Sequence, residues 1–340
     1  MKNPDLPYYV THYFKSYLTG IKNVSPHTIA SYAVTFKLLI AFCEDVCGIK
    51  TEKLKLAHMD EERITDFLNW LEKERNSSVT SRNQRLVAIH SFFRYVQKKL
   101  PVHMEAIGGI LEIPYKKAPQ TVVYYLTEDE MRVLLAQPSG RGWGSFRDKV
   151  LLSVLYDTGA RVQELVDLKV KNIRLEMPPV VTLHGKGDKT RQVPIMQSTV
   201  QLLKSYLSSY KGNPGISRGE NPLFVNQKKQ PLSRWGISHI VKKYVKKAQE
   251  EGLLQMSFPV TPHIFRHSKA VHMLRAGINL IYIRDFLGHV DCTTTEIYAR
   301  ADTETKRKAI EAFCEDIFPK ENLLDWNESN DLMSFLDSLY

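Results

Sequence analysis

The segment E-I-P-Y-K-K-A-P-Q-T, residues 112–121, constrains the fold of this chain more than any other stretch. It combines two prolines with two lysines and separates two regions of regular apolar pattern, which is typical of an exposed linker. A chain of 340 residues is also too long for one ordinary hydrophobic core. We therefore predict two domains, residues 1–115 and 123–318, joined by a linker at 116–122 and followed by an acidic tail at 319–340.

The net charge is distributed unevenly along the chain. The whole chain carries a formal charge of +10, whereas residues 301–340 carry −6, which leaves +16 on residues 1–300. A cationic surface of this size favours a polyanionic partner, because neutralising phosphates releases counterions. Double-stranded DNA is the expected partner, although general solubility would account for the charge about as well.

Composition also indicates the compartment. We find no run of about 18 apolar residues that could span a bilayer, and the N-terminus lacks the apolar region of a secretory signal. A cytoplasmic protein with reduced thiols and no membrane contact is expected. Four cysteines are spaced like neither a disulfide framework nor a zinc ribbon, so neither a metal nor another cofactor is expected. They are Cys43, Cys47, Cys292 and Cys314.

Apolar periodicity predicts an all-helical N-terminal domain. The sequence S-P-H-T at 25–28 reads as a capped helix start, and further helices are expected over about 60–75 and 80–100. The last of these has an apolar stripe on one face and basic residues on the other. We predict that this basic face and the linker lysines bind DNA, with a solvated surface as the alternative. The predicted DNA-binding residues are Arg82, Arg85, Arg94, Lys98, Lys99, Lys116 and Lys117.

The second region is also mainly helical but contains one β signal. Helices are predicted near 126–135 and 146–156, and the pattern returns to helix from Pro231. Between them, P-V-V-T-L-H, G-K-G-D-K-T and R-Q-V-P-I, residues 179–195, read as the strand, turn and strand of a hairpin. The expected fold is mainly α with a small antiparallel β-sheet.

A histidine and an arginine lie together at a predicted helix start. Thr261 and Pro262 read as the N-cap and first helical residue, so His263 and Arg266 share a face near the positive end of the helix dipole. Such a position suits a phosphate, and a guanidinium there can grip two phosphate oxygens. Taken alone, the pair more often solvates a surface.

Other chemically active residues occur in similar settings. Arg161 follows a glycine turn in a segment whose apolar residues would anchor it, and Lys186 lies between two glycines of the hairpin turn. The stretch L-G-H supplies His289, and Tyr298 follows nine residues later.

Together these stretches resemble the tyrosine recombinase family, also called the phage integrases. The matching motifs are T-G-A-R-V-Q-E-L, H-G-K-G, H-I-F-R-H and L-G-H followed by Tyr298, and they span residues 120–310 in family order. Gln163 departs from the family, where many members have a smaller residue. The resemblance implies a helical core-binding domain in front of a catalytic domain, closing around duplex DNA as a clamp.

The resemblance also implies a catalytic set, namely Arg161, Lys186, His263, Arg266, His289 and Tyr298. Tyr298 would attack a DNA phosphodiester to form a 3′-phosphotyrosyl link, with His263 as base and Lys186 as the acid that protonates the leaving 5′-oxygen. The two arginines would clamp the non-bridging oxygens, and the second histidine would hydrogen-bond to the phosphate. Neither ATP nor a metal is required by this scheme, which conserves bond energy in the covalent link.

Several of these roles have rival explanations. Asp157 and Glu164 are expected to orient the arginines, although helix capping or surface charge would explain them equally well. Lys189 could take the place of Lys186, and the tyrosine could be an ordinary core residue. Arg191 or His267 could be ordinary surface groups.

The resemblance further implies cutting and rejoining of four strands through a Holliday junction in a tetrameric synapse. An integrase or transposase of a mobile element is the favoured setting, with a chromosome-dimer resolvase as the alternative. The same motifs would also suit a topoisomerase or a catalytically silent DNA-binding regulator, and a second recombinase or accessory protein could take part.

The acidic tail is expected to form an amphipathic helix that docks on a neighbouring protomer or on its own chain. Its apolar face would consist of Leu332, Phe335, Leu336 and Leu339.

Overall fold

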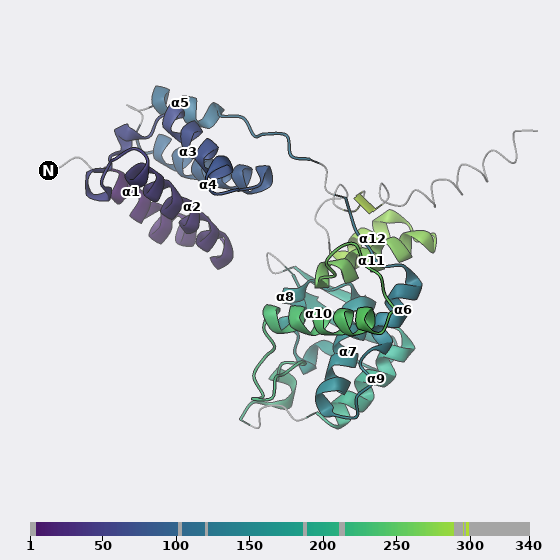
Figure 1. Ribbon diagram of the computed structural model, residues 1–340. Coiled ribbons are helices and arrows are strands. Elements are labelled where there is room, and N and C mark those ends of the chain that lie inside the picture. The colour runs from purple at the N-terminus through teal and green to yellow at the C-terminus, as the bar shows by residue number, and fades with distance from the viewer. Residues whose placement is uncertain are drawn as a thin grey trace, which may run out of the picture. The chain divides into compact units, whose positions relative to one another are not determined.

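The computed structural model describes residues 5–100, 104–119, 122–185, 189–210 and 215–288, together with Thr295, Ile297 and Tyr298. The chain forms two compact units, residues 1–121 and 122–340, coloured purple to blue and blue to yellow in Figure 1. The predicted fold class is confirmed, because the described residues are mainly helical and include one small antiparallel sheet. Lys186, His289 and the predicted tail helix lie outside the described residues.

Unit 1 is entirely helical in its described part. Three of its helices begin where the sequence predicts, because the side chains of Ser25, Asp60 and Ser78 accept hydrogen bonds from backbone N–H groups of the first turn. The helices are α1 Leu6–His12, a π-helix Tyr13–Ile21, α2 Pro26–Asp45, α3 Glu61–Lys73, α4 Val79–Gln97 and α5 Met104–Glu112, with 3₁₀ turns at Thr51–Lys53 and Leu56–His58.

Helix α2 is, among the described residues, the one helix long and apolar enough to cross a membrane by length and composition. The core helix of a globular domain passes the same test. Here Phe36, Leu39 and Phe42 of α2 are buried in the apolar core of unit 1. One face of α2 therefore packs into the core of this unit.

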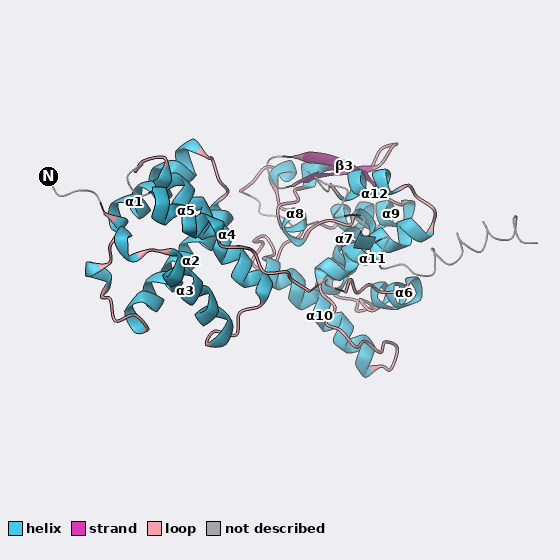
Figure 2. Ribbon diagram, turned by 90° about the horizontal axis from the view of Figure 1, so that it is seen from above, coloured by secondary structure: helices cyan, strands magenta, loops and turns pink. Residues whose placement is uncertain are grey.

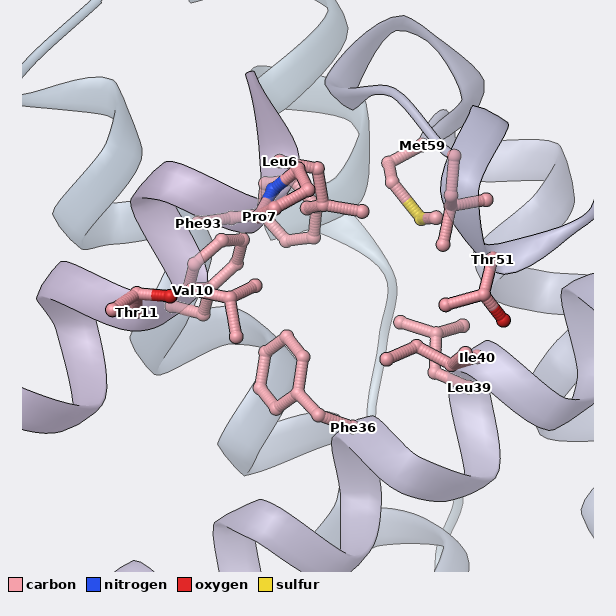
Figure 3. A pocket seen from close by; sticks show the side chains of 12 residues that line it. Leu6, Pro7, Val10, Thr11, Phe36, Leu39, Ile40, Thr51, Met59 and Phe93 are labelled. Atoms are coloured by element: carbon pink, nitrogen blue, oxygen red, sulfur yellow. The ribbon is translucent and has the colours of Figure 1, made fainter. Parts of the chain in front are cut away.

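Unit 1 also contains an apolar cavity of about 260 Å³ (Figure 3). Residues of α1, α2, α4 and the segment from Thr51 to Met59 form its walls. Its lining has no charged side chain and no histidine, so it offers nothing for phosphate or acid–base chemistry. The lining residues are Leu6, Pro7, Val10, Thr11, Phe36, Leu39, Ile40, Thr51, Leu54, Met59, Phe92 and Phe93.

Unit 2 contains a bundle of helices and the sheet (Figures 1 and 2). Its helices are α6 Glu128–Ala136, α7 Trp143–Thr158, α8 Val162–Val166, α9 Gln197–Ser208, α10 Arg234–Glu250, α11 Pro262–Arg275 and α12 Leu280–Leu287. The strands are β1 Ile173–Arg174, β2 Val180–His184 and β3 Thr190–Pro194, in the order β1-β2-β3. Strands β2 and β3 form the predicted hairpin, whereas β1 is too short to leave an alternating pattern in the sequence.

Helix α7 organises the core of unit 2. Leu151, Leu152 and Leu155 are fully buried, and α7 packs against α9 and α11. The helix ends at Gly159, whose φ of +56° favours glycine. A Cβ atom there would lie 2.9 Å from Cδ2 of Leu287, so the glycine lets the end of α12 approach the end of α7. This close approach brings the C-terminal ends of α7 and α12 together.

Candidate active site

Three arginines converge on the C-terminal end of α12. Nε of Arg191 donates to the carbonyl oxygen of Phe286 at 2.9 Å. Nη2 of Arg266 donates to the carbonyl oxygen of Leu287 at 2.7 Å. Nη2 of Arg161 donates to the carbonyl oxygen of Gly288 at 3.1 Å. The last carbonyls of a helix lack partners within the helix and lie at the negative end of its dipole. The three guanidinium groups satisfy these oxygens and are held side by side.

Glu164 lies between two of these arginines. Its Oε1 accepts hydrogen bonds from Nη1 of Arg161 at 2.9 Å and Nη1 of Arg191 at 2.7 Å. Its Oε2 accepts from Nη2 of Arg191 and from the backbone N–H of Arg161, both at 2.8 Å. Burial raises the pKa of Glu164, but the hydrogen bonds and charges of Arg191 and Arg161 lower that pKa more, so the net direction is downward. The carboxylate therefore stays charged at neutral pH beside the arginine that it was expected to orient.

Arg266 is the more deeply buried of the two predicted catalytic arginines, with 4% of its surface exposed. Its Nη1 donates to the carbonyl oxygen of Gly159 at 2.8 Å, so α11 is tied to the ends of both α7 and α12. Burial and then the charge of Arg161 lower the pKa of Arg266 to about 10, which still leaves it protonated at neutral pH. By contrast, the side chain of Arg161 is 35% exposed.

His263 lies in the first turn of α11 and is exposed. Thr261 occupies the predicted N-cap position, although its side chain makes no capping hydrogen bond. Desolvation lowers the pKa of His263, as do the charges of Arg266 and Arg161. Either cause leaves a neutral imidazole, which can accept a proton, at pH 7.

Tyr298 is buried against the same helix. Its hydroxyl oxygen lies 3.0 Å from Nδ1 of His267, and 3% of its surface is exposed. Burial raises the pKa of Tyr298, and the nearby Arg266 and Arg161 oppose that rise only in part. Burial, followed by the proximity of His263 and Arg266, lowers the pKa of His267 to about 4. The phenol therefore meets a neutral imidazole in this conformation.

The structure thus brings together residues from three separate stretches of the chain, namely Arg161 and Glu164, His263 and Arg266, and Tyr298. The structure excludes the alternative that Arg191 and His267 are ordinary surface groups, because the side chain of Arg191 is only 12% exposed and His267 contacts the tyrosine. Strand alternation could have found Arg191, which is two residues from the fully buried Val193 on β3. Helical spacing could have found His267, four residues after His263.

Asp157 does not orient the arginines through any hydrogen bond among the described residues. Its Oδ2 accepts from the backbone N–H of Met196 at 2.7 Å, and its Oδ1 lies 3.4 Å from Nζ of Lys269. This corrects the prediction, because the carboxylate joins the end of α7 to the start of α9 and to α11. Within the described ranges of both units, no group of three or more His, Cys, Asp or Glu side chains could hold a metal ion.

The predicted DNA-binding residues of unit 1 differ in exposure. Arg82 is only 4% exposed, and its Nη1 donates to Asn83 Oδ1 and to the carbonyl of Pro114, both at 3.1 Å. Its assignment to a DNA-facing surface was wrong, because the segment after α5 covers that side of α4. Arg85 is half-buried and donates to the carbonyl of Ser31 at 3.1 Å. The others are exposed, namely Arg94, Lys98, Lys99, Lys116 and Lys117.

Comparisons with known proteins define the class. The sequence model of the phage integrase family matches residues 124–305, and that of the N-terminal SAM-like domain of phage integrases matches residues 12–101. Together with the fold, these matches define an enzyme that transfers DNA strands. The chain belongs to the phage integrase family and is a tyrosine recombinase.

Individual relatives agree with this assignment. A protein named as an integrase/recombinase from Sinorhizobium fredii is 34% identical over 91% of this chain and 92% of its own length. The tyrosine recombinase XerD of Halalkalibacterium halodurans is also 34% identical, over 86% of this chain and 92% of its own length. The crystal structure of the XerH recombinase superposes with a TM-score of 0.69 at 24% identity, covering 86% of this chain and 81% of XerH.

Proposed function

We propose that this chain is a site-specific recombinase that cuts and rejoins duplex DNA through a 3′-phosphotyrosyl intermediate. The observation that carries the proposal is the buried Tyr298 hydroxyl, which contacts His267 and lies close enough to Arg266 and Arg161 for their charges to act on it. A phenol among guanidinium groups can attack a phosphate whose charge those groups offset. The XerH structure and a transposon integrase structure with a TM-score of 0.67 are both complexes with DNA, which supports duplex DNA as substrate.

Arg161 and Arg266 would bind the non-bridging oxygens of the scissile phosphate. Glu164 holds one edge of the Arg161 guanidinium, while the exposure of that side chain leaves room for a ligand. Planar guanidinium groups fixed in this way stabilise the charge of a pentacoordinate transition state without having to reorganise. From the family motifs, His289 would add a hydrogen bond to the phosphate.

Covalent chemistry would begin at Tyr298. Its oxygen forms a bond to phosphorus as the bond from phosphorus to the 5′-oxygen breaks, and the leaving oxygen takes a proton that we assign to Lys186. The phenolic proton passes to a neutral imidazole. We assign that role to His263, with His267 holding the hydroxyl before DNA is bound.

The biological setting that we propose is a mobile element, with this chain as its integrase or transposase. The Sinorhizobium relative and the transposon integrase structure support this setting. A chromosome-dimer resolvase is the second candidate, because the family motifs do not separate the two settings. For either setting we propose a tetramer on DNA in which the acidic tail docks on a neighbouring protomer.

The experiment uses nicked DNA duplexes of randomised sequence, incubated with the full-length chain and then denatured in detergent. We expect the wild type to yield covalent adducts whose sequence identifies the site, and Tyr298→Phe to yield none while still binding that site. Two differently labelled duplexes bearing the recovered site should then exchange ends. Absence of any adduct would contradict the proposed enzyme, and adducts without exchange would indicate a topoisomerase instead.

A further inference from the structure

We infer that Arg191 is a positioning residue of the active site, which sets the orientation and the available charge of Arg161 through Glu164. The inference rests on the proposed function, because Arg161 is taken there to bind the scissile phosphate. Arg191 has no counterpart among the catalytic residues predicted from the family motifs. Its contacts, however, join Glu164 to the end of α12, which also holds Arg161.

Arg191 is directed into the protein by its strand. It pairs with Leu183 across the hairpin, and its strand β3 lies beside α12 (Figure 2). Each of its three side-chain nitrogens has a partner inside unit 2: Nε contacts the carbonyl of residue 286, and the two Nη atoms contact the two oxygens of Glu164. A side chain engaged in this way is suited to holding neighbours in place, not to binding DNA.

Glu164 is the shared partner through which Arg191 acts on Arg161. With both arginines present, one carboxylate is divided between two guanidinium groups. Without Arg191, the buried charge of Glu164 would have Arg161 as its remaining guanidinium partner and would draw it into a two-pronged pair. Arg161 would then offer fewer N–H groups and less positive charge to a phosphate.

The geometry requires a guanidinium at this position. A lysine has a single nitrogen, which cannot reach the carbonyl of residue 286 and both oxygens of Glu164 together. The packing is also tight, because a Cβ atom on Gly288 would lie 3.0 Å from Cδ and from Nη1 of Arg191. Gly288 has a φ of +66°, so this position favours glycine for both reasons.

The test compares Arg191→Gln and Arg191→Lys with a matched control, Arg174→Gln. Arg174 lies in the same sheet, is exposed, and donates to the carbonyl of Pro178. The substrate is the nicked duplex recovered with the wild type. At saturating DNA, we expect both Arg191 variants to form the covalent adduct about 100-fold more slowly, with the Kd for DNA changed by less than about threefold. The control should behave as the wild type.

A second substitution separates positioning from a general loss of structure. In the Arg191→Gln background, Glu164→Gln removes the carboxylate that captures Arg161, so we expect it to recover about tenfold of the lost rate. A residue that merely stabilised the fold would not be rescued in this way. A wild-type rate for either Arg191 variant, or no rescue by Glu164→Gln, would overturn the inference. If Arg191→Gln does not fold, the charged Arg191→Lys variant decides by its rate alone.

Amide hydrogen exchange provides a readout that does not depend on recombination. Loss of the bond to residue 286 should increase exchange in peptides that cover residues 280–288 in both Arg191 variants, but not in Arg174→Gln. If the wild type forms no adduct with any duplex, the proposed function fails, and the exchange data still decide whether Arg191 fixes this helix end. Unchanged exchange would then contradict the inference.

Discussion

The hydroxyl oxygen of Tyr298 lies 3.0 Å from Nδ1 of His267, one helical turn after His263 on α11. This contact places the imidazole of His267 against the proposed nucleophile, whereas His263 on the same helix is exposed. Burial raises the pKa of Tyr298, so the phenol gains no acidity from this environment and needs an acceptor for its proton. The two histidines can be ranked by experiment.

For the first prediction, His263→Gln and His267→Gln are compared at saturating substrate. Loss of a general base costs about 10²–10⁴-fold, so we expect His263→Gln to slow formation of the covalent adduct by that range while DNA binding is retained. His267→Gln should slow the same step by only about tenfold, because it removes a contact that orients the hydroxyl. Rates from rapid quenching check this, and a larger loss for His267→Gln would reverse the two roles.

The second prediction concerns stability and pH. The folded-state pKa of His267 is lowered to about 4, whereas the unfolded value is near 6.5. Between these values the unfolded chain binds a proton that the folded chain does not, so the free energy of unfolding should fall as the pH falls through this window. Above pH 6.5 His267 is neutral in both states, so the stability that its neutral form supports is fully present.

Other histidines with lowered pKa, namely His90, His263 and His272, act in the same direction, so the difference between two proteins is needed. Urea unfolding of the wild type and of His267→Gln at pH 7, 6 and 5 provides it. We expect a shallower pH dependence in the variant. If the free energy of unfolding depended on pH equally in both proteins, the pKa of His267 would not be lowered by folding.

The third prediction separates two arginines of α4. Arg82→Ala should lower the free energy of unfolding by about 1–3 kcal/mol, because it removes a buried side chain and the hydrogen bond by which that side chain ties α4 to Pro114. Its effect on DNA affinity should be small. Arg94→Ala should leave stability within about 0.5 kcal/mol but weaken DNA binding and reduce the salt slope by about one.

Titrations over a range of salt concentrations check both variants against the wild type. The wild-type affinity should fall steeply with salt, as counterion release requires for a protein that binds several phosphates. A wild-type affinity insensitive to salt would contradict phosphate binding by the exposed residues of unit 1. An unchanged salt slope for Arg94→Ala would remove only that residue from the interface.

Site residues could be predicted from the sequence where their role depends on neighbours within a few residues. They could not be predicted where their role depends on contacts with distant segments. Arg161, Glu164, His263 and Arg266 lie in short motifs at helix starts, where capping and glycine signals are readable, and the order of these motifs implied one site. The role of Arg191 depends instead on a carboxylate 27 residues earlier and a carbonyl 95 residues later. Strand alternation could have indicated that Arg191 is buried, but no local pattern identifies partners so far away in the sequence.

Burial of Arg82 escaped prediction for the same physical reason. A helical projection of α4 shows which residues share a face, but it does not show which other segment covers that face. The cover is the stretch around Pro114, 32 residues further along the chain. Fold class was easier to predict, because capping residues, apolar periodicity and the hairpin turn each act within a few residues.

The fourth prediction uses two glycines at different points of α7. Gly144 lies in its first turn, where an added Cβ atom would have nothing within 4 Å, so Gly144→Ala should be neutral or stabilise by up to about 1 kcal/mol. Gly159 ends the helix with a φ of +56°, and an added Cβ would lie 2.9 Å from Leu287. Gly159→Ala should therefore destabilise by about 1–3 kcal/mol through backbone strain and displacement of α12.

Displacement of α12 should also shift Arg266 in the active site, because Arg266 donates to the carbonyls of both Gly159 and Leu287. We therefore expect Gly159→Ala to slow formation of the covalent adduct even where the protein is fully folded, as shown by its circular dichroism at low temperature. Gly144→Ala should cleave at the wild-type rate. If Gly159→Ala lost stability but kept the wild-type rate, the helix ends would not need their close approach for catalysis, and the arginines could be aligned by Glu164 and the sheet alone.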